Sequence, residues 1–134
     1  MEKSKKVSSR EQLYKLIGKL PEKNSSYLQR LFQNAPPWLF DEMNFVLIDK
    51  GNTFIREGAP INQVFILVSG NVRAMDYRIM NIEYNYMNFH PVTMFGSMEL
   101  LNNMEVYQTT LVAETTCNMI SIPASALMRW MKGD

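Results

Sequence analysis

The sequence is poor in several residue types, and each shortage excludes a class of protein. It has 134 residues and a single cysteine, Cys117, so no internal disulfide can form and nothing points to an oxidising compartment. No apolar run approaches the roughly 20 residues that a membrane-spanning helix needs. No apolar segment follows the basic N-terminus, as it would in a secretory signal. We therefore expect a cytoplasmic protein without membrane contact.

The signatures of common catalytic and cofactor sites are also missing. His90 is the only histidine, and one imidazole cannot build the metal centre of a cupin-type enzyme, which needs several. Neither G-x-x-x-x-G-K-[ST] nor G-x-G-x-x-G occurs in the sequence. An iron–sulfur site would need a cluster of cysteines. We expect no cofactor and no enzymatic activity, and we interpret Cys117 as a core residue and His90 as a loop residue.

The charge is low overall but unevenly placed. The formal net charge is +1, yet residues 1–30 carry eight Lys or Arg against three Glu, a net +5. Residues 79–128 contain no Lys or Arg and four Glu, a net −4. The N-terminal lysines could follow nucleic-acid phosphates. Because they flank a single amphipathic helix, a solvated helix face or a tail is the favoured interpretation.

Helical spacing is present at both ends of the chain. Residues 11–20, EQLYKLIGKL, place apolar side chains at i, i+3, i+4 and i+7, and Pro21 stops this helix. A second helix is predicted from an N-cap at Asn24 or Ser25 to about Pro36, followed by a short helical turn. After Pro123 the helical spacing returns, and we expect that the sequence is cut within this last helix.

Between these two helical regions, the sequence pattern changes from helical spacing to short β-type runs. From Asn44 to Pro123, seven or eight β-type runs are separated by turn signals every 8–12 residues. No alternation of strands with helices is present, which argues against a parallel α/β sheet. The pattern predicts a mainly β fold, either a sandwich or a barrel.

Three stretches resemble one known fold. They are GNTFIREGAPINQVFILVSGNVR, MFGSMELLNN and TTLVAETTCNMISIP, and they are similar to the cyclic-nucleotide-binding fold of the catabolite-activator/Fnr (Crp/Fnr) family of bacterial transcription regulators. The resemblance covers residues 39–131. It implies a double-stranded β-helix, or jelly roll, with flanking N-terminal helices and the start of a C-terminal helix.

The resemblance also implies how the chain is divided. Residues 1–38 would be an N-terminal helical segment, residues 39–123 the β-roll, and residues 124–134 the start of a truncated dimerisation helix. DNA would be bound only through a C-terminal helix-turn-helix that is absent from this chain. The full-length protein would be a homodimer.

A ligand cradle is implied near Gly96, but its charged contacts are missing. Nucleotide-binding relatives resemble F-G-E-L-A-L-L followed by an arginine. Here Phe95 and Gly96 fit, Ser97 stands where the ribose-binding carboxylate would be, and Tyr107 stands where the phosphate-binding arginine would be. Glu99 comes two residues late, and we expect it to point elsewhere. A hydrogen bond to a charged group is worth roughly 1.5–3 kcal/mol. Losing both the carboxylate contact to the ribose and the arginine contact to the phosphate would therefore weaken nucleotide binding on the order of a hundred- to ten-thousand-fold. We therefore expect no tight binding of cAMP or cGMP.

Another effector could occupy the cradle. Tyrosines and methionines of this region, including Met94, could line a pocket for a neutral, aromatic or apolar molecule, or they could simply pack the barrel. Arg73 and Arg78 on the neighbouring hairpin could also reach in. The candidate ligand-binding residues are Gly96, Ser97, Met98, Glu99, Tyr107, Gln108, Tyr84 and Tyr86.

Three functions follow as hypotheses. The first is the effector-sensing domain of a Crp/Fnr-type transcription regulator, with an unknown small-molecule effector as its partner. The second is a degenerate domain that binds no ligand and serves dimerisation or interaction. The third is a cupin-like metalloenzyme, against which the lone histidine argues.

Overall fold

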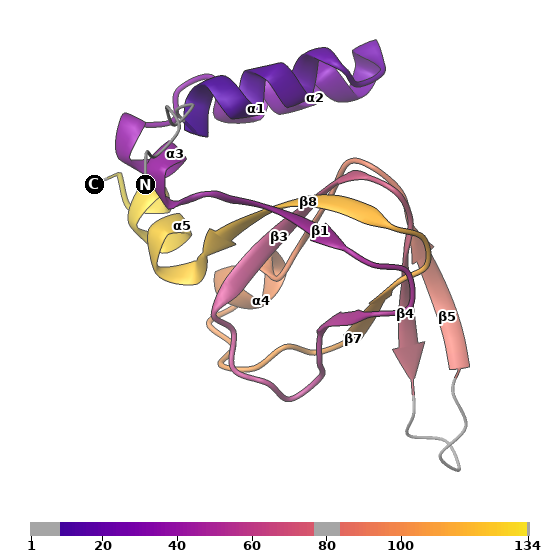
Figure 1. The fold of residues 1–134 in the computed structure, drawn as a ribbon. Helices are drawn as coiled ribbons and strands as arrows, with labels where there is room; N and C mark the ends of the chain where they lie inside the picture. Colours follow the sequence, from indigo (N-terminus) through magenta and orange to yellow (C-terminus); the bar gives the residue numbers. More distant parts are fainter. Residues whose placement is uncertain (1–8, 77–83, 134) are drawn as a thin grey trace, which may run out of the picture.

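The computed structural model describes residues 9–76 and 84–133. These residues form five helices and eight strands, coloured along the chain in Figure 1. In chain order the elements are α1 (Ser9–Gly18), α2 (Glu22–Phe32), α3 (Pro37–Glu42), β1 (Asn44–Ile48), β2 (Thr53–Ile55), β3 (Gln63–Ser69), β4 (Val72–Asp76), β5 (Tyr84–Phe89), β6 (Thr93–Phe95), α4 (Ser97–Leu101), β7 (Thr110–Ala113), β8 (Cys117–Pro123) and α5 (Ala124–Met131).

The strands form two four-stranded antiparallel sheets. One has the order β1-β8-β3-β6 and the other the order β2-β7-β4-β5. Strands that follow each other in the sequence often fall in different sheets, as the jelly roll requires. Between the sheets lies a buried core that includes Leu67, Val72, Phe95, Ala113 and Met119. The prediction of a mainly β jelly roll is therefore confirmed.

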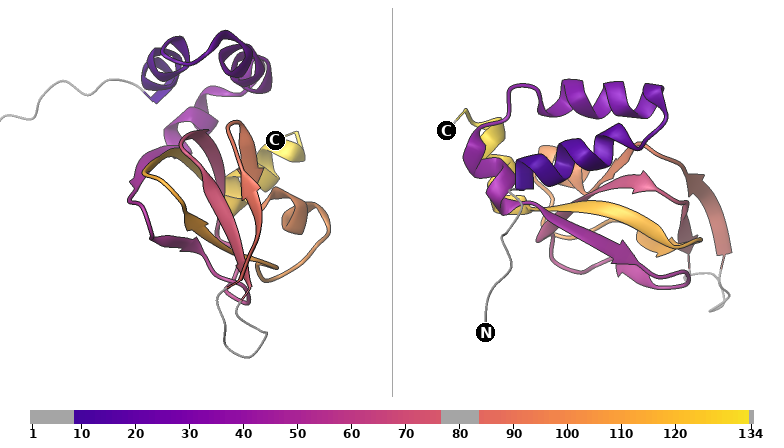
Figure 2. Two further views of the ribbon diagram at one scale, coloured as in Figure 1. Left: turned by 90° about the vertical axis from the view of Figure 1, so that its right-hand side faces the viewer. Right: turned by 45° about the horizontal axis from the view of Figure 1, so that its top comes forward.

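A second core lies on the outer face of the first sheet. Val64, Ile66 and Ile120 point from β3 and β8 toward the helices, where they pack with residues such as Leu13 and Leu28. Figure 2 shows α1 and α2 side by side over this sheet. Strand β3 is thus buried on both faces, which explains its continuous apolar run.

Helix α5 joins the same helical layer. It packs on α3 and on β8, and the ring of Trp130 stacks on that of Phe32 in α2, with centroids 6.2 Å apart. The guanidinium of Arg129 lies 4.0 Å from the centre of the Trp38 ring in α3. The end of the β-roll is therefore physically connected to the N-terminal helices.

The start of the second helix differs from the prediction. An N-cap was expected at Asn24 or Ser25, but α2 already begins at Glu22, after Pro21. Pro21 has φ −54° and ψ 147°, an extended conformation that ends the preceding segment and precedes the first helical turn. The N–H of Ser25 donates to the Pro21 carbonyl at 2.9 Å. The proline therefore replaces the expected polar cap as the boundary.

No helix in the described ranges has both the length and the apolar character that a membrane crossing requires.

Candidate functional site

The loop between β6 and α4 is built around Gly96. This residue has φ +96°, in the left-handed region that side chains other than glycine rarely adopt. A Cβ atom there would lie 3.2 Å from the Gln63 carbonyl oxygen and 3.4 Å from Cε1 of Tyr107. Both the backbone angle and the close approach therefore require glycine at the position that the resemblance assigns to the ligand cradle.

The resemblance places Tyr107 where a phosphate-binding arginine would be, and in the structure its hydroxyl group is already hydrogen-bonded. The side chain is only 4% exposed. Its hydroxyl donates to the Gln63 carbonyl at 2.6 Å and accepts from the Gln63 N–H at 3.1 Å. The backbone of Tyr107 also pairs with Ala59 and Gly58. The hydrogen bonds of Tyr107 therefore link the loop before β7 to the start of β3.

A cavity of about 180 Å³ opens beside Gly96. It lies under the first turn of α4 and against β2, β5, β6 and β7. Most of the lining is apolar, and the polar contributions come from two threonines and one glutamate. The lining residues are Ile55, Phe89, Thr93, Met94, Phe95, Gly96, Met98, Glu99, Thr109 and Leu111.

Glu99 is one of the residues that line this cavity, and whether its carboxylate points toward a ligand stays a prediction. Its Oε2 accepts a hydrogen bond from the backbone N–H of Gln108 at 3.2 Å. Ser97 is not among the residues that line the cavity. The acidic residue that lines the cavity is therefore at position 99, whereas the resemblance implied a carboxylate at position 97.

Among the described residues that line the cavity, Glu99 is acidic and none is basic. Within residues 9–76 and 84–133, no Lys or Arg lines it. Arg73, considered as a replacement cation, donates from Nε to Sδ of Met75 at 3.3 Å, and Arg78 lies outside the described residues. A phosphate entering here would meet the Glu99 carboxylate without a compensating cation.

Arg56 lines a different space. Arg56 borders a cavity of about 270 Å³ on the other side of Ile55, together with Phe54, Phe65 and Tyr107. This second cavity shares only Ile55 with the one beside Gly96.

The remaining predicted residues take different places. Met98 is 64% exposed and lies at the mouth of the cavity. Gln108 is exposed, and its Nε2 donates to the Val106 carbonyl at 2.9 Å. Tyr84 and Tyr86 lie in β5, but their side chains fall outside what the structure describes.

An aromatic floor was missed by the sequence reasoning. The ring of Phe95 makes edge contacts with Phe89 at 5.2 Å and with Phe54 at 5.7 Å between centroids. Both phenylalanines sit in short strands flanked by polar residues, so the sequence offered only their aromatic character as a signal. Phe89 and Phe95 line the cavity, and their rings give it an apolar surface suited to an aromatic or aliphatic group.

His90 and Cys117 belong to a different part of the roll. A hydrogen bond of 2.8 Å joins His90 Nδ1 to Asn71 Oδ1. Cys117 is fully buried, its Sγ donates to the carbonyls of Asn71 and Thr115 at 3.2 Å, and burial raises the pKa of this thiol. In the described part of the chain, no three His, Cys, Asp or Glu side chains are grouped so that they could hold a metal ion.

Comparison with known proteins places the chain in one family. Residues 45–134 match the model of the cyclic nucleotide-binding domain. No curated protein sequence matches the chain significantly.

Solved structures with the same fold include regulators of several kinds. The sensor domain of the transcriptional regulator DNR from Pseudomonas aeruginosa is 20% identical, with a TM-score of 0.67 over 83% of this chain and 78% of that chain. The c-di-GMP responsive global regulator CLP from Xanthomonas campestris is 17% identical, with a TM-score of 0.61 over 69% of this chain and 44% of that one. The regulatory subunit of a cAMP-independent protein kinase A from Trypanosoma brucei is 17% identical, with a TM-score of 0.60 over 83% and 46%. At these identities the likeness shows the fold.

Proposed function

The chain belongs to the cyclic nucleotide-binding domain family, and from that premise we propose that it is the effector-sensing domain of a Crp/Fnr-type transcription regulator that does not use a cyclic nucleotide. Its effector would be a small apolar or aromatic molecule, either neutral or positively charged. The role is binding and signalling rather than catalysis.

The chemistry of the cavity beside Gly96 is the observation that carries this proposal. Its floor is aromatic and aliphatic, its single charged group is the Glu99 carboxylate, and no described cation faces it. A phosphodiester bound there would meet no described cation, and the negative charge of Glu99 would repel it. An apolar ligand would gain from desolvation, and an ammonium group would gain from Glu99 as well.

A conformational change at the cavity would reach the rest of a regulator through the end of the β-roll, where β8 leads into α5. Strand β8 continues directly into α5, and the N–H of Ala124 donates to the Asn62 carbonyl at 2.9 Å, next to the Gln63 backbone that Tyr107 holds. A ligand that moved the Gly96 loop would therefore disturb the base of α5. In the proposed regulator this helix continues into the dimer and its DNA-binding helix-turn-helix, with residues 1–38, 39–123 and 124–134 as helical segment, β-roll and helix start.

A second candidate is a domain without any small ligand. The cavity volume of about 180 Å³ lies below the roughly 300–1,000 Å³ of typical ligand sites, and the Tyr107 hydroxyl is already satisfied. In that case the roll would serve only dimerisation or interaction.

Three ligands of one size and shape separate these functions. Phenethylamine, 2-phenylethanol and phenylacetate share the phenyl group and differ in charge. We expect calorimetry and thermal shift to rank phenethylamine first and phenylacetate last. Glu99→Gln should remove the advantage of the amine, whereas Glu105→Gln, at an exposed acid nearby, should leave it unchanged. If none of the three compounds changes the melting temperature, the domain without a ligand is favoured.

A further inference from the structure

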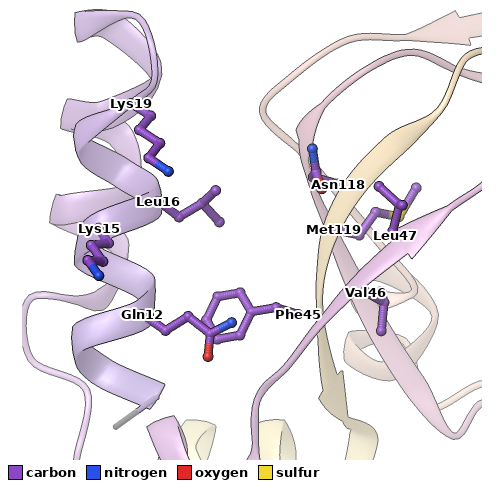
Figure 3. A pocket seen from close by; sticks show the side chains of 9 residues that line it. All are labelled: Gln12, Lys15, Leu16, Lys19, Phe45, Val46, Leu47, Asn118 and Met119. Atoms are coloured by element: carbon purple, nitrogen blue, oxygen red, sulfur yellow. The ribbon is translucent and has the colours of Figure 1, made fainter. Parts of the chain in front are cut away.

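A third concave site, which shares no lining residue with the cavity beside Gly96, lies between α1 and the first sheet. Figure 3 shows this groove with the helix on one side and β1 and β8 on the other. Its volume is about 300 Å³. The lining residues are Gln12, Lys15, Leu16, Lys19, Phe45, Val46, Leu47, Asn118 and Met119.

The groove results from how α1 meets the sheet. Leu13 and Ile17 direct the helix onto the core over β3 and β8. Strand β1 is one of the two edge strands of that sheet. Leu47, opposite Asn118 in the register of β1 and β8, is therefore left 62% exposed. An apolar strip thus remains uncovered between helix and edge strand.

The floor and walls of the groove are largely apolar. Leu16 points from the helix into the gap, and Phe45 and Leu47 face it from β1 (Figure 3). A hydrocarbon chain laid here would cover the exposed part of Leu47 and contact Leu16 from the other side. Such burial is favourable by about 25 cal/mol per Å² of apolar surface.

The charge of the groove has one sign. Lys15 and Lys19 both line the groove and stand one helical turn apart on α1, so both side chains are long enough to bring an ammonium group to its rim. Among the residues that the structure describes, no Asp or Glu lines the groove. Glu11, the one acidic residue of α1, is not among the lining residues. The rim therefore favours an anion.

We propose that this groove binds an amphiphilic organic anion, namely a carboxylate with a hydrocarbon tail of medium length. The tail lies between Leu16 and Leu47, and the carboxylate faces Lys15 and Lys19. The volume of about 300 Å³ reaches the lower end of the usual range for small-molecule sites. A protein partner would need about 800 Å² on each side, which is more than nine lining side chains around one groove offer.

Such a ligand would connect two parts of the chain. It would contact α1 and β1 at once and so hold the N-terminal helix against the β-roll. This site shares no residue with the cavity beside Gly96. Its occupancy is therefore separate from the proposed effector site, and the two proposals can fail independently.

Octanoate and 1-octanol test the proposal, since they share a tail and differ in the anionic head. We expect octanoate to bind saturably in calorimetry and to shift the amide NMR signals of Leu16, Leu47 and Asn118. The double variant Lys15→Gln/Lys19→Gln should bind octanoate about three- to tenfold more weakly and leave 1-octanol unchanged. Lys23→Gln, an exposed lysine of α2 outside the groove, is the matched control and should bind octanoate like the wild type.

Leu47→Ser tests the apolar half of the site. Because Leu47 is already 62% exposed, this variant should keep its melting temperature while losing about three- to tenfold in affinity for both compounds. The proposal is overturned if octanoate gives no saturable binding at millimolar concentration. It is equally overturned if the Lys23→Gln variant loses as much affinity as the double variant, or if the NMR shifts gather around Gly96 instead.

Discussion

The hydroxyl group of Tyr107 should stabilise the fold through its two hydrogen bonds to Gln63. Tyr107→Phe removes one oxygen and leaves the ring in place. The hydroxyl group donates its hydrogen to the Gln63 carbonyl at 2.6 Å, and its oxygen accepts from the Gln63 N–H at 3.1 Å. The variant therefore leaves two backbone groups of Gln63 without these partners at once.

The size of the effect follows from these two bonds. A hydrogen bond contributes about 0.5–1.5 kcal/mol net, and a buried group left unpaired costs about 1–3 kcal/mol. Gln63 is only partly buried, so water can replace part of what is lost. We expect Tyr107→Phe to lower the free energy of unfolding by about 1–3 kcal/mol, with an unchanged dependence on denaturant.

Urea unfolding followed by tryptophan fluorescence measures this difference. Tyr27→Phe is the control, since Tyr27 is 46% exposed and its loss should stay within about 0.5 kcal/mol. If Tyr107→Phe proved as stable as the Tyr27 variant, the hydroxyl would have no structural role. The reasoning would also be refuted if Tyr107→Phe lost ligand affinity while keeping full stability, because the hydroxyl would then serve the ligand.

Three further predictions concern the roll and its helices. Gly70 and Gly58 both have positive φ, but a Cβ at Gly70 would lie 2.6 Å from a backbone oxygen and one at Gly58 would meet nothing within 4 Å. Gly70→Ala should therefore cost more than about 3 kcal/mol and Gly58→Ala only about 1 kcal/mol in urea unfolding; equal costs would contradict the close contact. Burial raises the pKa of Cys117, so the unfolded chain loses the thiol proton first, and stability should fall as the pH rises past the ordinary pKa of a thiol. A Cys117→Ala variant with the same alkaline slope would exclude this cause. Arg129→Gln should cost about 0.5–1 kcal/mol through lost contact with the Trp38 ring, and a neutral result in thermal unfolding would show that the contact contributes nothing.

The fold could be predicted because its signals are local and repeated. Glycines at turns such as Gly58 and Gly70, both with positive φ in the structure, separate strands short enough to recognise from composition. The apolar run of β3 was the exception to simple alternation. It is buried on both faces because the helices cover one face of its sheet and the second sheet covers the other. This burial depends on tertiary packing and cannot be deduced from the sequence of the strand alone.

The resemblance pointed to the segment around Gly96, but the sequence did not show how the residues around it pack. The partner of the Tyr107 hydroxyl is Gln63, 44 residues earlier, and no spacing rule connects the two. The orientation of Glu99 depends on how a five-residue helix sits over the Gly96 loop. The groove at Leu47 depends on where α1 stops covering the sheet. Each of these features arises from packing between distant segments, so the sequence could name the residues without placing them.

Calorimetric titration of this chain with cAMP tests most directly whether the cavity beside Gly96 has lost its phosphate chemistry. No described cation lines that cavity and the Glu99 carboxylate does, so we predict no saturable heat up to millimolar nucleotide. A dissociation constant in the micromolar range or below would contradict this prediction. If that binding then vanished in Arg56→Gln, the phosphate would be located in the neighbouring cavity that Arg56 lines.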